Sequence, residues 1–213
     1  RWQAIGQHPF MDCSKVLNTA VALKQEQEKV KRPRVFLDKS PRIVAYQLRR
    51  LNNERLLLVE RNTSHAKYTP VYEAILERGG MSPQYRDEAV LALVKLKKSN
   101  AVTVLIESLS KVKNDSRQGR QTAWELGRML VAQPKLLLVQ EKESLKTASQ
   151  DEHQQLQVAS YASLVSCGES ELAAKIARQS EGNTVAWLQS FQLIQDQVIR
   201  ESQFETVFAL LNK

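Results

Sequence analysis

The sequence predicts an all-α protein built from stacked pairs of helices, and three observations support this prediction. Apolar residues recur at helical spacing through most of the chain, in segments joined by short polar corners. Ser or Thr followed by Pro, a pair typical of helix starts, occurs three times. The 213 residues include only seven Gly and six Pro, which suits helices with short corners better than many β-turns.

Residues 82–109 show the pattern most clearly. Ser82 can accept a hydrogen bond from the free amides of a first helical turn, and Pro83 lacks the N–H that would have no partner there. Ser99 or Asn100 is expected to cap a second helix after a corner of about three residues, so the two helices would lie antiparallel. The first apolar stripe is Ala89, Val90, Leu93, Val94 and Leu96, with Arg86, Lys95, Lys97 and Lys98 outside it, and the second is Val102, Leu105, Ile106 and Leu109.

The chain before residue 39 has a different character. Residues 1–13 form a mixed lead-in, residues 14–30 predict a helix with a wholly polar second half, and two prolines bracket a break over residues 31–41. We therefore divide the chain into residues 1–38, a lead-in with a helix and a basic linker, and residues 39–213, one continuous helical-repeat domain.

The repeat domain is expected to alternate helices and corners to its end. Ser40 with Pro41 and Thr69 with Pro70 predict helix starts, and Asn52 or Asn53 predicts a further cap. Gly79 and Gly80 are expected to supply a left-handed helix end. Asp151 is expected to open a helix, and Gly182 and Asn183 to precede one. The later helices are predicted over residues 117–132, 134–148, 151–167, 170–179, 184–194 and 197–213.

Small residues recur where paired helices would approach closely. Superposing the first helix of each pair aligns Ala89, Ala123, Ala159 and Ala186, at spacings of 34, 36 and 27 residues. Helix pairs that recur about every 30 to 45 residues are typical of an α-solenoid. Because one helix pair cannot hide its apolar faces alone, such units need neighbours.

The frame around Ala89 favours HEAT/ARM-like repeats. It reads Arg-x-x-Ala-x-x-Ala-Leu over residues 86–93 and continues with Ala101, Leu105 and Leu109 in the second helix. The tryptophan, tyrosine and proline positions of tetratricopeptide repeats do not recur.

Positive charge gathers in the N-terminal part of the chain. The net charge is +8, and residues 1–80 carry 15 Lys and Arg against 8 Asp and Glu. This part is the candidate site for an anionic partner such as nucleic acid, lipid headgroups or an acidic protein. The alternative is a solvated helix face followed by a basic linker. The candidate residues are Lys29, Lys31, Arg32, Arg34, Arg49 and Arg50.

The sequence carries no catalytic constellation. Phosphate-loop, dinucleotide-binding and zinc-protease motifs are all missing. Cys13 and Cys167 have no metal-ligand spacing and are expected to be buried free thiols, with a single bridge as the alternative. We therefore expect no enzyme activity, no cofactor and no metal. No run approaches the roughly 18 apolar residues of a membrane span.

Histidines and other soft ligands offer only weak alternatives. His8, Met11 and Cys13 are haem or metal ligands by type, but a packed lead-in is the favoured interpretation. His65 and His153 lie far apart in polar stretches, and Asp151, Glu152 and His153 together resemble a capping cluster.

Two tryptophans raise a nucleic-acid alternative. HEAT-like DNA glycosylases bind damaged DNA through aromatic residues in a concave groove, and Trp124 and Trp187 lie in first helices of two predicted repeats. Both fit the apolar stripes, in nearly neutral repeats, so core packing is favoured.

Residues 39–96 support a more particular resemblance. The segment KSPRIVAYQLRRLNNERLLLVERNTSHAKYTPVYEAILERGGMSPQYRDEAVLALVKL resembles a helical region of large exported planctomycete proteins of the membrane-bound dehydrogenase and haem-binding type. That region commonly lies between a sugar-dehydrogenase-like propeller and a c-type cytochrome domain. The resemblance covers about residues 39–213 and implies export or a periplasmic location. This chain lacks the C-x-x-C-H haem motif and a run of propeller strands.

The sequence therefore predicts a non-enzymatic scaffold. It would mediate protein–protein interaction or hold the neighbouring domains of a larger exported redox-type protein apart. The alternative is a nucleic-acid-binding HEAT-like protein, such as a base-repair enzyme, that uses the basic N-terminal third.

Overall fold

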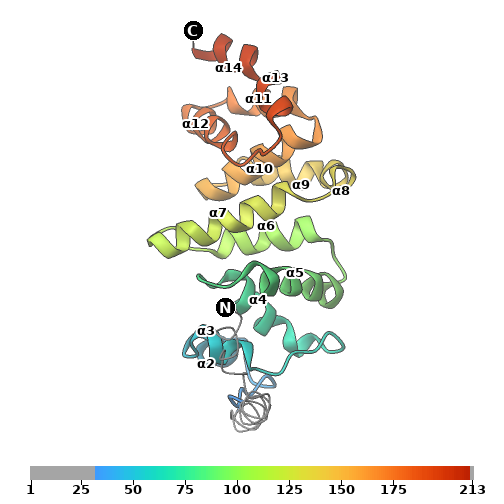
Figure 1. Ribbon diagram of the computed structural model, residues 1–213, viewed down its shortest axis with the longest axis vertical. Coiled ribbons are helices and arrows are strands. Elements are labelled where there is room, and N and C mark those ends of the chain that lie inside the picture. Colours follow the sequence, from blue (N-terminus) through green and yellow to red (C-terminus); the bar gives the residue numbers. More distant parts are fainter. Residues whose placement is uncertain (1–31, 212–213) are drawn as a thin grey trace, which may run out of the picture. The chain divides into compact units, whose positions relative to one another are not determined.

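The computed structural model describes residues 32–211, with side chains described through residue 209. The chain divides into two units, Arg1–Arg34 and Val35–Lys213, and the description below concerns the second. All regular structure between residues 32 and 211 is helical, with no strand, which confirms the all-α prediction (Figure 1). The predictions for residues 1–31, including the helix at 14–30, lie outside the described residues.

The unit begins with three α-helices and one 3-10 helix. They are α2 (Pro41–Arg49), α3 (Asn53–Leu57), the 3-10 helix η1 (Ala66–Tyr68) and α4 (Thr69–Glu77). Asn52 is the N-cap of α3, and its side chain accepts a hydrogen bond from the Arg55 amide. Thr69 with Pro70 was expected to start a helix, and α4 begins at Thr69, directly after η1.

Helices α5 (Pro83–Lys97) and α6 (Ala101–Lys111) form the pair expected over residues 82–109. Asn100 caps α6 by accepting from the Thr103 amide, as predicted. Ser82 is the N-cap residue of α5 by position, but its side chain makes no capping hydrogen bond, so that part of the prediction is wrong. Lys98 turns the chain at the end of α5 with a left-handed φ of 51°, a conformation unusual for a residue other than glycine.

The remaining helices run from α7 to α14 with short connections. His153, not Asp151, caps α10, and Ser180 caps α12, so Gly182 and Asn183 lie inside the first turn of α12 rather than before it. The helix predicted over residues 134–148 is broken in two at Glu141. The elements are α7 (Arg117–Val131), α8 (Lys135–Gln140), α9 (Lys142–Ala148), α10 (Gln154–Cys167), α11 (Ser170–Ala177), α12 (Glu181–Ser190), α13 (Gln197–Ser202) and α14 (Phe204–Leu211).

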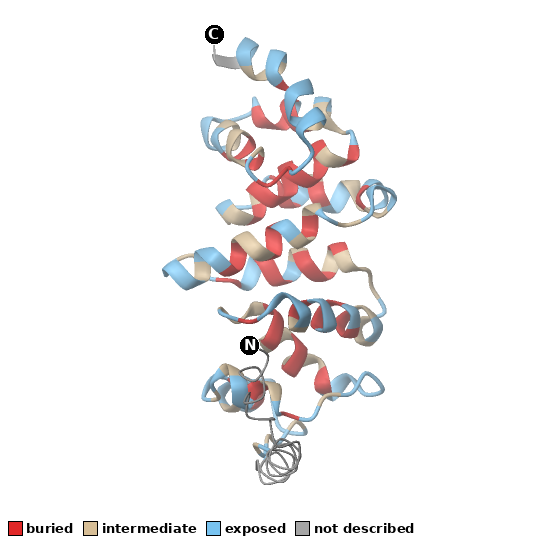
Figure 2. Ribbon diagram, in the orientation of Figure 1, coloured by how far each residue is buried: buried red, intermediate tan, exposed pale blue. Residues whose placement is uncertain are grey.

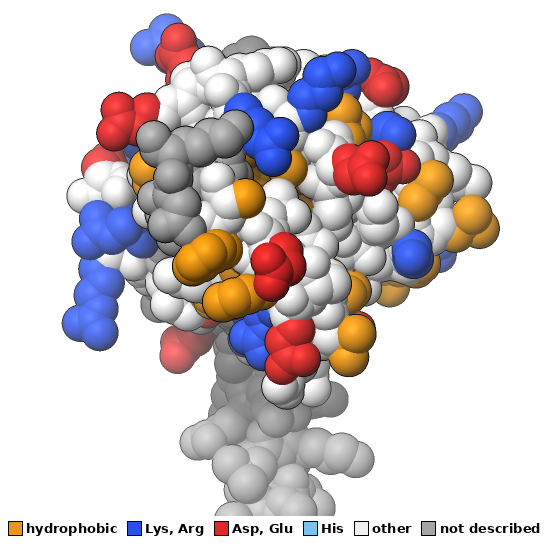
Figure 3. Space-filling view, turned by 90° about the horizontal axis from the view of Figure 1, so that it is seen from above, with side chains coloured by type: hydrophobic (Ala, Val, Ile, Leu, Met, Phe, Trp, Pro, Cys, Tyr) orange, Lys and Arg blue, Asp and Glu red, His pale blue; other side chains and the backbone are white. Residues whose placement is uncertain are grey.

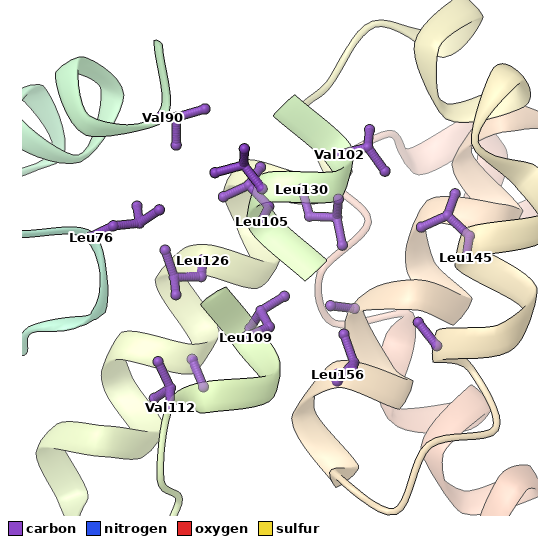
Figure 4. Packing of buried hydrophobic residues seen from close by; sticks show 14 of the residues in the cluster. Leu76, Val90, Val102, Leu105, Leu109, Val112, Leu126, Leu130, Leu145 and Leu156 are labelled. Carbon is purple, nitrogen blue, oxygen red and sulfur yellow. The ribbon is translucent and has the colours of Figure 1, made fainter. Parts of the chain in front are cut away.

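The main helix contacts join elements at most four positions apart along the chain. Helix α4 packs against α2, α5 and α6; α6 packs against α7; α7 packs against α10; and α10 packs against α12. Buried residues lie on the faces that these helices turn toward one another (Figure 2). Figure 4 shows apolar side chains of successive helices meeting in one core, from Leu76 and Val90 through Leu105 and Leu126 to Leu145.

Helix α10 is the most deeply buried element of the unit. Ten of its residues are buried, and it contacts α7, α8, α9, α11 and α12. A helix that is apolar on every side belongs in an interior rather than on a surface. The side chains of Ala159 and Ser163 are small, so other helices can approach α10 closely. The buried Ser163 hydroxyl donates a hydrogen bond to the Ala159 carbonyl at 2.8 Å.

Small residues permit the close approach of α7 and α10. A Cβ added at Gly127 would lie 3.3 Å from the Cβ of Ala159 and 3.3 Å from Leu193 Cδ1. The four alanines that align between the predicted repeats, Ala89, Ala123, Ala159 and Ala186, are all buried.

Candidate functional site

The predicted basic set is divided between the two units. Arg32 and Arg34 belong to the first unit and are exposed, whereas Arg49 and Arg50 lie at the end of α2 in the second unit and are also exposed. Lys29 and Lys31 lie outside the described residues. The structure therefore brings together only the last two members of the set, which adjoin in sequence.

Arg49 and Arg50 have different surroundings. The Arg50 guanidinium donates to the Tyr46 hydroxyl at 3.1 Å and lies 5.6 Å from the centroid of the Tyr46 ring. Arg49 lines a cavity of about 280 Å³ between α2 and α4, together with the carboxylates of Glu73 and Glu77. An anionic ligand at Arg49 would therefore meet two acidic neighbours.

Two arginines and a glutamate link helices α2, α4, α5 and α7. We call Arg78, Arg86 and Glu125 the arginine strap. Arg78 donates to the carbonyl of Leu51, and at 2.8 Å to that of Leu48, at the end of α2. Arg86, on α5, donates to the Arg78 carbonyl at 3.1 Å. Arg86 Nη1 also lies 2.8 Å from Glu125 Oε2 on α7, so the strap joins four helices.

Arg86 is the unexpected member of the strap. It was expected on the solvated side of α5, but its side chain is only 1% exposed. Burial lowers the pKa of its guanidinium, and the charge of Glu125 opposes that shift. Its Nε and Nη1 groups are buried without a hydrogen-bond acceptor, because the close contact with Glu125 lacks hydrogen-bond geometry.

A second cluster of charges, the carboxylate–lysine network, joins α4, α5 and α6. Lys97 lies 2.8 Å from Glu73 and 2.7 Å from Glu107. Lys111 lies 3.2 Å from Glu73 and 3.7 Å from Glu77. These five charged side chains form ion pairs that link α4, α5 and α6.

The two acids of α4 respond differently to this network. Burial is the largest influence on the pKa of Glu77 and raises it to about 7, because the nearby Lys111 does not compensate for lost water. Burial also acts to raise the pKa of Glu73, but hydrogen bonds and charge from Lys97 and Lys111 outweigh it and lower that pKa overall.

The alternative ligand residues have structural roles. His153 caps α10 through Nδ1, and its Nε2 lies 2.7 Å from the Val112 carbonyl oxygen. Cys167 is a buried free thiol, as predicted, and burial raises its pKa. His65 is exposed at the start of η1. The alternative involving His8, Met11 and Cys13 lies outside the described residues, and among residues 32–211 no three His, Cys, Asp or Glu side chains could hold a metal ion.

The two tryptophans differ in burial. Trp187 is fully buried and packs edge-to-face on Phe191, with ring centroids 5.0 Å apart. Trp124 is only partly buried and packs against the core. A fully buried indole cannot stack on a nucleobase, so Trp187 belongs to the core.

The comparisons add no family to this description. Comparison with family models, with curated proteins and with solved structures gave no match. The resemblance to exported planctomycete proteins therefore stays a prediction. Within the described part of the chain, no helix has both the length and the apolar character needed to cross a membrane.

Proposed function

We propose that the unit Val35–Lys213 is a HEAT-like α-solenoid that acts as a non-enzymatic scaffold. It would bind a protein partner, or hold apart the neighbouring domains of a larger polypeptide. The observation that carries this proposal is the packing order, in which the main helix contacts join elements at most four positions apart along the chain and add to one continuous core.

The burial of the aligned alanines supports the same proposal. Ala89, Ala123, Ala159 and Ala186 occupy corresponding places in the predicted repeats, and each is at most 1% exposed. Recurrent small residues at buried helix contacts are what a repeated helix pair requires, because bulky side chains there would hold adjacent pairs apart.

Nucleic-acid binding is the second candidate, and the exposed Arg32, Arg34, Arg49 and Arg50 favour it. Against it, Arg49 shares its cavity with two carboxylates, and Trp187 is buried. Figure 3 looks onto the end of the unit that carries α13 and α14 and shows basic and acidic side chains interspersed there, so that end offers no continuous basic patch. Scaffolding is therefore the better-supported function.

Duplex binding at two salt concentrations separates the two candidates. Fluorescence anisotropy with a labelled DNA duplex is measured at about 50 and 200 mM salt, a range over which phosphate contacts lose most of their affinity. The scaffold proposal predicts weak binding that is no weaker in the variant with Arg32, Arg34, Arg49 and Arg50 changed to Ala. The matched control changes four other exposed cations to Ala, namely Lys113, Arg117, Lys175 and Arg200.

Tight binding would overturn the scaffold proposal under one condition. The affinity for the duplex at low salt must fall steeply when salt is added. It must also be lost in the variant with Arg32, Arg34, Arg49 and Arg50 changed to Ala, and kept in the control variant.

A further inference from the structure

A groove runs along one face of α7. It consists of two adjoining hollows of about 290 and 160 Å³, which share Arg128, Ala132 and Gln195 in their walls. Together their volume lies in the lower part of the range of ligand pockets, about 300 to 1,000 Å³. We call this feature the α7 groove.

Helical periodicity explains why these residues share one face. Glu125, Arg128, Met129 and Ala132 stand at positions i, i+3, i+4 and i+7 of α7, and all four line the first hollow. Pro83 and Arg86, one turn apart at the start of α5, line the same hollow. The loop between α12 and α13 contributes Gln195.

The first hollow carries an excess of positive potential. Arg128 is exposed and makes no ion pair within the described part of the chain, and Arg86 has two buried nitrogens without an acceptor. The 15-residue helix α5 begins here with no acidic residue in its first turn and no side-chain cap. Its positive end therefore adds to the two guanidinium groups, against the single carboxylate of Glu125.

The second hollow is mainly apolar. Its walls include Val131, Leu193, Ile194 and Ile199. Asp196 also lines it, but its carboxylate already accepts hydrogen bonds from the amides of Val198 and Ile199 at the start of α13. Ser166 Oγ lines this hollow too and is buried without a partner.

We infer that the α7 groove docks a peptide segment of a partner protein that carries one carboxylate next to apolar side chains. The carboxylate is held by Arg128, with Arg86 and the start of α5 behind it. The apolar side chains lie against Ile194 and Ile199. Charge complementarity selects this occupant, because the exposed cation Arg128 has no ion-pair partner within the described part of the chain. The two carboxylates of the groove already have partners, Glu125 in Arg86 and Asp196 in the amides at the start of α13. This inference rests on the proposed scaffold function and names the chemistry of its partner.

The test begins with selection from a phage-displayed random dodecapeptide library on the wild-type protein. Selected sequences are expected to share an Asp or Glu adjacent to Leu, Ile, Val, Phe or Met. One selected peptide is then synthesised with a fluorescent label, and its binding to wild type and variants is measured by anisotropy.

Three variants locate the binding. Ala132→Trp fills the groove at a residue common to both hollows without changing charge, and Arg128→Glu reverses its exposed cation. Each is expected to weaken binding roughly tenfold or more. Arg117→Glu makes the same charge change on the same helix outside the groove and should leave the affinity unchanged. Thermal melting of each variant shows that it is folded.

The outcomes separate this inference from the function on which it rests. If selected peptides bind the two groove variants as tightly as wild type, the groove is not the docking site, while the scaffold proposal stands. Selection of peptides without an acidic residue, or of none, also overturns the groove inference. The scaffold proposal is tested separately, by the duplex-binding experiment described above.

Discussion

Two regions of the unit are held together by different means. Between α4, α5 and α6, part of the contact is a network of five charges around Lys97 and Lys111. Between α7, α10 and α12, the contact is mainly apolar and rests on small residues and the buried Trp187, while Gln154 and Gln157 of α10 donate hydrogen bonds to side chains of α12. The stability of the first region is therefore expected to depend on pH, and that of the second on the packing of its side chains.

The arginine strap is a charged contact, but it extends from the first region to α7 in the second. Arg86 lies on α5, and its ion-pair partner Glu125 lies on α7. Asn100 makes a further link, because its Oδ1 caps α6 while its Nδ2 donates to Glu141 at 2.6 Å. Substitutions in each region should therefore have distinguishable signatures.

The largest effect is expected from Trp187→Ala in the packed region. Removing a fully buried indole leaves a cavity, so we expect a loss of about 3 to 5 kcal/mol in the free energy of unfolding. Urea unfolding measures it, with the partly buried Trp124→Ala as the matched control. An equal loss in the two variants would contradict the contrast in burial.

The strap should show the next largest effect. Arg86→Ala removes its hydrogen bond to the Arg78 carbonyl and leaves a space, at an expected cost of about 2 to 3 kcal/mol. Arg86→Met keeps much of the volume and also removes the two donors without acceptors, so it should cost less. The pair of Arg61 and Glu88, whose side chains are 21% and 43% exposed, is the less buried control, and Arg61→Ala should cost at most about 1 kcal/mol. Equal costs at Arg86 and Arg61 would show that the strap is not structural.

The charged network should respond to pH through Glu77. Its folded pKa of about 7 lies above the ordinary value of 4.5, so the folded state binds the proton more tightly. Stability therefore falls as pH rises from about 4.5 to 7 and stays lower above that range. Glu73 has the opposite sign, since its lowered pKa gives stability that is lost only as pH falls below about 4.5.

Glu77→Gln isolates this contribution. We expect the variant to be about 2 kcal/mol more stable than wild type at pH 8 and nearly equal to it at pH 5, measured by urea unfolding. The charged groups around Glu77 are Glu73, Lys97 and Lys111, and Arg49 and Arg78 line the same cavity. A variant that loses stability at pH 8 would mean that the ion pair with Lys111 outweighs the burial of the carboxylate.

The smallest expected effect distinguishes two helix starts. Asn100→Ala removes an observed cap and should cost about 1 kcal/mol, whereas Ser82→Ala should cost close to nothing because Ser82 makes no capping bond. Thermal unfolding of the two variants is the measurement. A cost at Ser82 equal to that at Asn100 would restore the capping role predicted from the sequence.

The sequence predicted the helical class and most helix positions because these depend on local rules. Apolar spacing located α5, α6 and α7, and Asn52 and Asn100 cap the helices they were expected to cap. The strap was not predicted, because the partners of Arg86 lie 8 and 39 positions away and only folding brings them together. On a helix wheel a buried arginine looks the same as a solvated one.

The candidate site was less accessible to sequence reasoning than the fold. The count of basic residues pointed to the N-terminal third, but a count does not show the carboxylates beside Arg49. The α7 groove combines residues from α5, α7 and the loop before α13, which lie more than 100 positions apart at the extremes. The spacing of Glu125, Arg128, Met129 and Ala132 was the one local signal for it.

Native-state hydrogen exchange of Trp187→Ala tests the proposed repeat architecture most directly. If helices depend mainly on their neighbours in the chain, amides of α10, α11 and α12 lose protection relative to wild type, while those of α4, α5 and α6 keep most of theirs. An equal loss of protection in all these helices would contradict the account, because it would mean that the unit opens as one globular core.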